Sequence, residues 1–260
     1  RDQSDCSANT IQSYCECIRM LIQFCCEREQ VNADELDMER IDDKTILAFL
    51  DSLEKERGNL PQTRNQRLAA IKSFYRYLAL QEPTLLDACK RICTIRAKKT
   101  EHKVIEALSE EEVESILRAV PSETAWHQRD YALLLLMYNT GARVQELADL
   151  RIEEVKTGDY PQVKLKGKGR KERINPLWEK TAAAINQWLA TREKAGITSE
   201  YLFVNSHRRK LSRFGIAHIV SKYVTLAVAT CPSLEKKKVT PHTFRHTTAL
   251  HMIQSDVDIT

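Results

Sequence analysis

The stretch "DYALLLLMYNTG", residues 130–141, decides the centre of the fold. Apolar side chains occupy nearly all sides of a helix built from it, and a helix that is apolar all round is buried. Gly141 then suits a helix end. We therefore expect a central core helix over about 127–139, followed by a new helix that begins near Arg143.

The elements around this helix indicate a mixed domain. Ser109 and Glu112 form an S-x-x-E capping box, which predicts a helix over about 109–119. The segments "QVKLK" (162–166) and "KERINPL" (171–177) flank the turn "GKGR" and predict a small antiparallel sheet, with Val163 and Leu165 facing inward. Further helices are expected at about 178–194, 212–229 and 241–254, and the last of these is expected to be a buried apolar helix.

The first ninety residues have helical periodicity instead. Three helices are expected in "NTIQSYCECIRMLIQFC", "DDKTILAFLDSLEKERG" and "TRNQRLAAIKSFYRYLAL", with a short fourth near 84–92. The basic, aperiodic stretch "TIRAKKTEHKVIEA" (94–107) interrupts this pattern. We predict a mainly α protein with a small antiparallel β-sheet: an all-helical domain at 1–95, a basic linker at 96–107 and an α+β domain at 108–260.

Composition narrows the function classes. The net charge of the 260 residues is only +4, but basic residues gather in two short stretches, 90–103 and 164–173, as is typical of nucleic-acid contacts. No apolar run is long enough for a membrane span. None of the eight cysteines forms a CxxC pair, no carboxylate cluster suits a metal ion, and no P-loop occurs. We expect no cofactor, no metal, no membrane and no small-molecule substrate.

Separate segments offer cations to one anion. Arg143 lies in the first turn of its expected helix, where backbone amides and the helix dipole favour an anion. Lys168 stands between two glycines at the hairpin tip. His242 and Arg245 are spaced i,i+3, so both lie on one helix face. His246 fits a supporting role better than direct contact.

Other basic and polar residues suit contacts along DNA. The polar side of the third helix carries several of them, and the hairpin and the helix at 212–229 carry more. The predicted DNA-contact set is Thr63, Arg64, Arg67, Lys72, Lys166, Arg170 and Arg213.

The order "TGARVQEL" (140–147), "GKGRKER" (167–173) and "PHTFRHT" (241–247) resembles the tyrosine recombinase (phage integrase) family, and specifically its Xer-like members. The resemblance extends to "NTIQSY" and "TRNQRLAAIKSFYRY" in the helical domain, which is similar to the family's SAM-like core-binding domain. It therefore covers nearly the whole chain and implies a catalytic domain at 108–260.

The resemblance also implies residue roles. Arg143 and Arg245 would bind the scissile phosphate, Lys168 would protonate the 5′-hydroxyl leaving group, and His242 would bind the phosphate and assist proton transfer. Glu146 would orient the cations. The family's tyrosine nucleophile lies some thirty or more residues after the matched Arg245, so the sequence to Thr260 is expected to be a truncated recombinase that binds DNA without cleaving it.

The resemblance to this family also implies the binding partners and the cellular location of the protein. We expect a duplex DNA recombination site, self-association as a dimer or tetramer on DNA, and a cytoplasmic, nucleoid-associated location. Two alternatives stay open: a non-catalytic DNA-binding protein or decayed recombinase, and a type IB topoisomerase with a similar Arg–Lys–Arg–His set.

Overall fold

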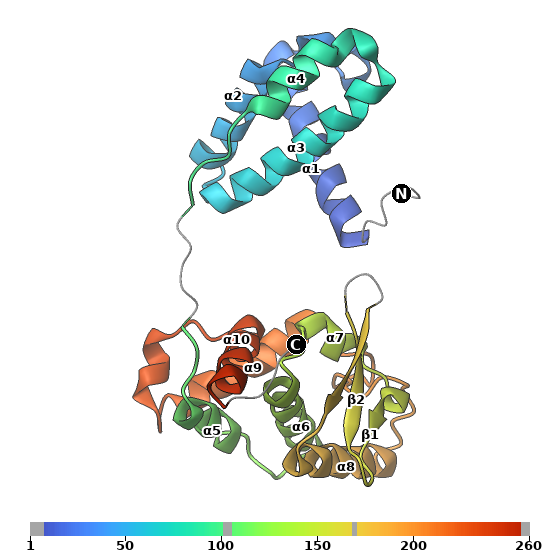
Figure 1. Ribbon diagram of the computed structural model, residues 1–260, viewed down its shortest axis with the longest axis vertical. Coiled ribbons are helices and arrows are strands. Elements are labelled where there is room, and N and C mark those ends of the chain that lie inside the picture. Colours follow the sequence, from blue (N-terminus) through green and yellow to red (C-terminus); the bar gives the residue numbers. More distant parts are fainter. Residues whose placement is uncertain (1–7, 101–105, 168–170, 256–260) are drawn as a thin grey trace. The chain divides into compact units, whose positions relative to one another are not determined.

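The computed structural model describes residues 8–100, 106–167 and 171–255. By its internal contacts the chain divides into two compact units, residues 1–103 and 104–260 (Figure 1). Each unit has its own hydrophobic core. Helices dominate both units, and the second also contains a three-stranded antiparallel sheet. The predicted fold class is confirmed.

Unit 1 is built from helices alone in its described part. An Asp42 carboxylate accepts the Thr45 N–H at 2.8 Å and so caps the second long helix. Buried side chains from all four α-helices, among them Phe49, Ile71 and Tyr75, form the core. The elements are α1 (Ala8–Glu29), η1 (Ala33–Glu35), η2 (Met38–Arg40), α2 (Asp43–Lys55), α3 (Pro61–Gln81), η3 (Pro83–Leu85) and α4 (Leu86–Thr94).

Unit 2 combines helices with the sheet. Ser109 and Glu112 form the predicted capping box, in which the Ser109 hydroxyl accepts the Glu112 N–H at 3.2 Å and the Glu112 carboxylate accepts the Ser109 N–H at 2.8 Å. The helices are α5 (Glu110–Arg118), α6 (Ala125–Thr140), α7 (Val144–Asp149), η4 (Ile152–Glu154), α8 (Glu179–Lys194), α9 (Arg213–Ala227), η6 (Pro232–Lys236) and α10 (Pro241–Gln254). The strands are β1 (Val155–Lys156), β2 (Gln162–Lys166) and β3 (Glu172–Pro176).

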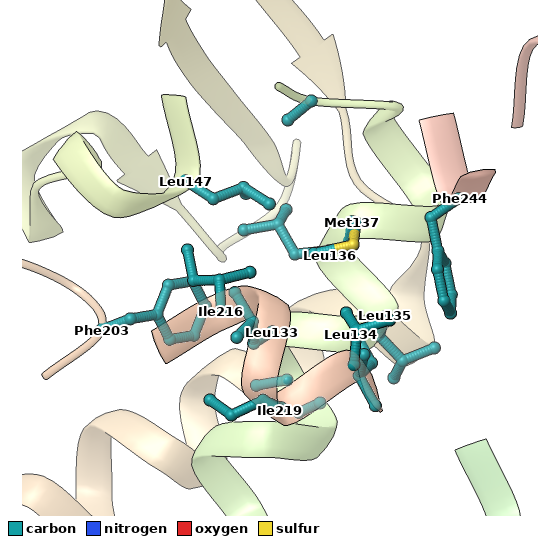
Figure 2. Close-up of a cluster of buried hydrophobic side chains, with 14 of the residues drawn as sticks. Leu133, Leu134, Leu135, Leu136, Met137, Leu147, Phe203, Ile216, Ile219 and Phe244 are labelled. Carbon is teal, nitrogen blue, oxygen red and sulfur yellow. The ribbon is translucent and has the colours of Figure 1, made fainter. Parts of the chain in front are cut away.

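Helix α6 is the centre of unit 2, as predicted. It packs against α5, α8 and α10 in unit 2 (Figure 1). Its residues 132–137 are all buried. Figure 2 shows Leu133 to Met137 among side chains from other elements, including Leu147, Phe203 and Phe244. Gly141 ends α6 with φ +55°, a left-handed conformation that glycine adopts without strain. This turn leads directly into Arg143.

The sheet has the order β1-β2-β3, and both pairings are antiparallel. Val163 and Leu165 are fully buried, which confirms their predicted inward direction. The two-residue strand β1 was not predicted from the sequence, because it is too short to show an alternating pattern.

Helix α10 was expected to be a buried apolar helix, and the structure corrects this. Its buried side chains are Phe244 and three threonines, whereas Leu250 and Ile253 are 40% and 56% exposed. Thr248 Oγ1 donates to the Tyr138 carbonyl at 2.7 Å, and Thr247 Oγ1 accepts the Leu108 N–H at 2.9 Å. Hydroxyl groups therefore attach the inner face of α10 to its neighbours. Among the described residues, no helix is long and apolar enough to span a membrane.

Candidate functional site

Arg143 and Glu146 form a paired start to α7. Arg143 is the N-cap residue, and its backbone N–H donates to Glu146 Oε2 at 2.8 Å. Its Nη1 donates to Glu146 Oε1 at 3.0 Å. The Glu146 carboxylate therefore already accepts a hydrogen bond from the Arg143 amide, so this one amide of the helix start is not free for an external anion. The Arg143 side chain is still 50% exposed, so its guanidinium is accessible.

Arg245 reaches this segment from α10. Its Nη1 donates to the Gly141 carbonyl oxygen at 2.5 Å, two residues before Arg143. The Thr240 hydroxyl caps α10 and Pro241 occupies its first position, so the segment begins as predicted. Residues that lie about a hundred positions apart in the sequence are therefore brought together at the end of α6.

Arg173 is a third arginine at the site. From strand β3 its Nη1 donates to Glu146 Oε1 at 3.0 Å, and its Nη2 donates to Glu146 Oε2 at 2.7 Å. Glu146 is 5% exposed, and its two oxygens accept all four of these bonds from Arg143 and Arg173. We call Arg143, Glu146, Arg173 and Arg245 the Glu146 cluster.

The sequence interpretation did not include Arg173 among the site residues, although a usable pattern was present. Arg173 is the cross-strand partner of Leu165, so the two side chains share one face of the sheet. Leu165 was predicted to face inward. A charged residue paired with an inward position needs a partner of opposite charge, and Glu146 provides it.

The electrostatics of the cluster follow from its burial and its charges. Burial raises the pKa of Glu146, but hydrogen bonds from Arg173 and Arg143 outweigh burial and lower it from 4.5 to about 2. The pKa of Arg245 is lowered by burial and by the positive charges of Arg143 and Arg173, while Glu146 acts in the opposite direction. Glu146 is therefore ionised at neutral pH and balances one of three arginines. The cluster keeps an excess of positive charge, which attracts an anion.

The other expected site residues lie on α10 and on the β2–β3 hairpin. His242 is exposed in the first turn of α10, one turn before Arg245. His246 is also exposed. Lys168 lies outside the described residues, as does Arg170. Gly167 at the base of the hairpin is described: a Cβ built on it would lie 3.3 Å from Glu146 Oε1 and 3.5 Å from Arg143 Nη1. The hairpin base therefore lies against the Glu146 cluster.

Tyr223 and Tyr201 each contact a charged side chain within unit 2. Tyr223 is fully buried, and its hydroxyl donates to Asp130 Oδ2 at 2.8 Å. Burial and the Asp130 carboxylate raise the pKa of Tyr223, so its hydroxyl stays protonated. Tyr201 lies under the Lys210 ammonium, 4.9 Å from the ring centre.

The structure contradicts one member of the DNA-contact set on α3. Arg64 is only 3% exposed, and its Nε lies 3.4 Å from Glu54 Oε2. A side chain buried in this way does not reach a phosphate, so Arg64 is a structural residue. Thr63, Arg67 and Lys72 are half-buried, and Arg67 Nη1 donates to the Ser13 carbonyl oxygen at 3.3 Å.

The remaining described members of the set are exposed. Lys166 lies on β2 with its Nζ 2.5 Å from Glu154 Oε1. Arg213 begins α9, and its guanidinium lies 4.8 Å from the centre of the exposed Phe214 ring. Neither contact removes the cation from the surface.

The arrangement suits recognition of a phosphate diester. Two accessible arginines converge from α7 and α10, and guanidinium groups bind pairs of phosphate oxygens. Among the described residues, no group of three or more His, Cys, Asp and Glu side chains is placed to hold a metal ion.

Comparison with known protein families gives two matches in this chain. The profile of the phage integrase family matches residues 106–260, and that of the phage integrase N-terminal SAM-like domain matches residues 2–84. A relative from Sinorhizobium fredii, named integrase/recombinase y4rD, is 37% identical over 249 residues, which cover 94% of this chain and 87% of the relative. Tyrosine recombinase XerD from Halalkalibacterium halodurans is 30% identical, covering 97% and 81%.

Solved structures share the fold. XerH site-specific recombinase bound to its difH substrate has a TM-score of 0.72 at 21% identity, covering 95% of this chain and 69% of that one. A lambda integrase dimer bound to a COC′ core site has a TM-score of 0.71 at 17% identity, covering 97% and 85%. At these identities the likeness concerns the fold.

Proposed function

Because this chain belongs to the phage integrase family, with tyrosine recombinases among its relatives, we propose that Arg143 and Arg245 bind the scissile phosphate of a duplex DNA recombination site. In this proposal the protein takes part in site-specific cleavage and rejoining of DNA strands through a 3′-phosphotyrosyl intermediate, with neither a metal ion nor ATP. The family predicted from the three motifs is confirmed.

The observation that carries the proposal is the convergence of Arg143 and Arg245. Arg245 donates a hydrogen bond to the carbonyl oxygen of Gly141, which lies only two residues before Arg143 in the chain. The Arg143 guanidinium is half-exposed. Negative charge grows on the non-bridging oxygens of a phosphodiester as the nucleophile attacks, and donors already fixed in place stabilise that charge best. A protein that only binds DNA has no need for two fixed arginines at one phosphate.

The other roles extend this assignment. His242 would donate a hydrogen bond to the phosphate, since it lies on α10 one turn before Arg245. Lys168 would protonate the 5′-oxygen of the leaving strand, and Glu146 would hold Arg143 in position. His246 would support α10 beside Arg245. The matches of both domain profiles and the recombinase relatives favour this reading over a type IB topoisomerase.

We further propose that the DNA backbone is contacted by the helical unit at 1–95, with Thr63, Arg67 and Lys72, and also by Lys166, Arg170 and Arg213. The basic linker at 96–107 would join this unit to the catalytic domain at 108–260. Solved relatives are a dimer on a core site and a tetramer on a Holliday junction, which supports assembly of copies on DNA. Its substrate would place the protein in the cytoplasm, at the nucleoid.

DNA binding is testable with the chain itself. Phosphate contacts release counterions, so the logarithm of the association constant should fall steeply with the logarithm of salt concentration, by roughly 0.9 per contact. Fluorescence anisotropy with a labelled duplex across a salt series measures this slope. A flat line would refute a DNA-binding function.

The two arginines are testable in the gene product, including any residues that follow Thr260. Arg143→Ala or Arg245→Ala should lower covalent protein–DNA adduct formation by about 10²–10³, the usual effect of removing one donor from developing charge. Duplex affinity should change little, because each arginine contacts one phosphate of many. The matched control is Arg118→Ala, an exposed arginine on α5 paired with Glu114, which should form adducts normally. Normal adducts in either site variant would refute the assignment.

Lys168 needs a different assay. A general acid matters when the leaving oxygen is a poor leaving group, and a 5′-bridging sulfur leaves without protonation. Lys168→Ala should therefore cleave ordinary DNA slowly and sulfur-bridged DNA nearly as fast as the wild type. Equal loss on both substrates would make Lys168 a binding residue only.

A further inference from the structure

Two arginines, Arg143 and Arg173, together donate four hydrogen bonds to the Glu146 carboxylate. Arg143 donates to it through its backbone and side chain, at 2.8 and 3.0 Å, and Arg173 donates through both terminal nitrogens, at 3.0 and 2.7 Å. Arg143 belongs to the start of α7 and Arg173 to strand β3. One buried carboxylate therefore joins two elements that are separate in the sequence.

Strand β3 orients its residues unusually. Ile174 faces outward and is 64% exposed, whereas the charged Arg173 faces the inner side beside Leu165. A strand whose burial followed hydrophobicity alone would have the reverse orientation, because burying Ile is favourable and burying a charge is costly. The register is therefore one that brings Arg173 to Glu146.

The base of the β2–β3 hairpin lies against the same carboxylate. The Gly167 N–H donates to the Lys171 carbonyl oxygen at 2.8 Å and closes the two strands. A Cβ at Gly167 would lie 3.3 Å from Glu146 Oε1, closer than most such contacts allow. Glu146 therefore contacts both Arg143 and the hairpin base, and Arg173 holds the Glu146 carboxylate in that position.

We propose that Arg173 is a positioning residue for DNA strand cleavage: by binding Glu146 from β3, it fixes the Arg143 guanidinium and the base of the β2–β3 hairpin in one arrangement around the scissile phosphate. Arg173 does not itself touch the phosphate in this proposal. The inference rests on the function proposed above for Arg143.

Other charges also act on Glu146. Arg143 belongs to the start of α7 and Arg173 to β3, while Arg245 acts from α10. A hollow beside Glu146, of about 270 Å³, is lined by further ionisable residues of η4, β2 and neighbouring segments: Asp149, Arg151, Glu154, Lys164, Lys166 and Tyr201. Of these charges, only Arg143 and Arg173 donate hydrogen bonds to the Glu146 carboxylate in the described structure.

The test compares the pH dependence of adduct formation in the gene product. In Arg173→Met, Glu146 stays buried but loses two charged donors, so it should take up a proton at a higher pH and release Arg143. Adducts should form about 10²-fold more slowly, as misplaced groups do. As the pH is lowered, the rate of adduct formation in Arg173→Met should fall at a pH at least about one unit higher than in the wild type.

Two further variants separate positioning from general damage. Arg173→Lys keeps one donor and should restore part of the rate. In the double variant Arg173→Met with Glu146→Gln there is no carboxylate to titrate at this position. The new loss of rate at acidic pH, which we call the acid limb, should therefore vanish. The matched control is Lys164→Met, which removes a cation from the same hairpin but from a pair with Glu172 instead of Glu146. It should leave the acid limb where it is.

A second readout needs neither DNA nor a nucleophile. Carbon-13 NMR of the chain with labelled glutamate, assigned by difference with Glu146→Gln, follows protonation of Glu146 directly. Its signal should not titrate above about pH 3.5 in the wild type and should titrate at higher pH in Arg173→Met.

The outcomes distinguish the two proposals. An unchanged titration in Arg173→Met, or a rate loss equal at all pH values, overturns the positioning role. A wild-type gene product that never forms adducts overturns the proposed function, whatever NMR shows for Glu146.

Discussion

Replacing Glu146 by Gln should make the stability of the chain depend less on pH. Glutamine keeps the shape of the side chain and removes its charge. In the wild type, Glu146 has a pKa of about 2 in the folded protein against an ordinary 4.5. A depressed folded pKa contributes stability above the unfolded value and loses it as the pH falls toward the folded value.

The magnitude follows from that difference. A depression of about 2.5 units at about 1.36 kcal/mol per unit corresponds to about 3 kcal/mol at neutral pH. The side chain is 3% exposed, so solvent screening takes little from this figure. Between pH 4.5 and pH 3, about 2 kcal/mol of the contribution should disappear, because the unfolded chain is then largely protonated at this residue while the folded protein is not.

Urea unfolding of the wild type and of Glu146→Gln from pH 7 to pH 3 measures the effect. The variant should be less stable by about 3 kcal/mol at pH 7, and the gap should narrow to about 1 kcal/mol at pH 3. A gap that stays constant with pH would show that the carboxylate is not held ionised by Arg143 and Arg173, and would refute the reasoning. The exposed Glu172→Gln on the same hairpin is the matched control and should show almost no gap, since exposed ion pairs contribute little.

Three further outcomes are expected. Phe244→Ala removes a fully buried ring from the inner face of α10 and should lower the free energy of unfolding by about 3–5 kcal/mol in urea titrations, whereas Ala249→Ser on the exposed face of α10 should change it little. Arg64→Met should change thermal stability but leave the salt slope of DNA binding unchanged, and a reduced slope would restore Arg64 as a phosphate contact. Tyr223→Phe leaves the buried Asp130 without one donor and should destabilise the chain by about 1–3 kcal/mol by calorimetry; an unchanged melting temperature would contradict this.

The sequence predicted those parts of the fold that depend on local pattern. The all-round apolar character of α6, the capping box of α5 and the alternation of Val163 and Leu165 each have a direct local cause, and the structure has all three. The family resemblance added the fold and the site motifs.

Local pattern is a weaker guide where contacts between distant residues decide the structure. Arg64 and Arg67 look alike in "TRNQR", but one faces the core toward Glu54 and the other bonds to the Ser13 carbonyl. Arg173 joined the site through a cross-strand register that brings it to Glu146. The inner face of α10 is held by threonine hydroxyls, which a hydrophobic pattern does not anticipate.

The bond from Arg245 to the Gly141 carbonyl also concerns the entropy of DNA binding. A free arginine samples many rotamers, and immobilising such a side chain at an interface costs about 0.5–1.5 kcal/mol. Arg245 is held before any phosphate arrives, and Arg143 is held by Glu146. Most of that loss therefore occurs during folding. If the two guanidinium groups bind a phosphate as proposed, the stability of unit 2, through its α6 and α10 core, sets how rigidly they are held for it.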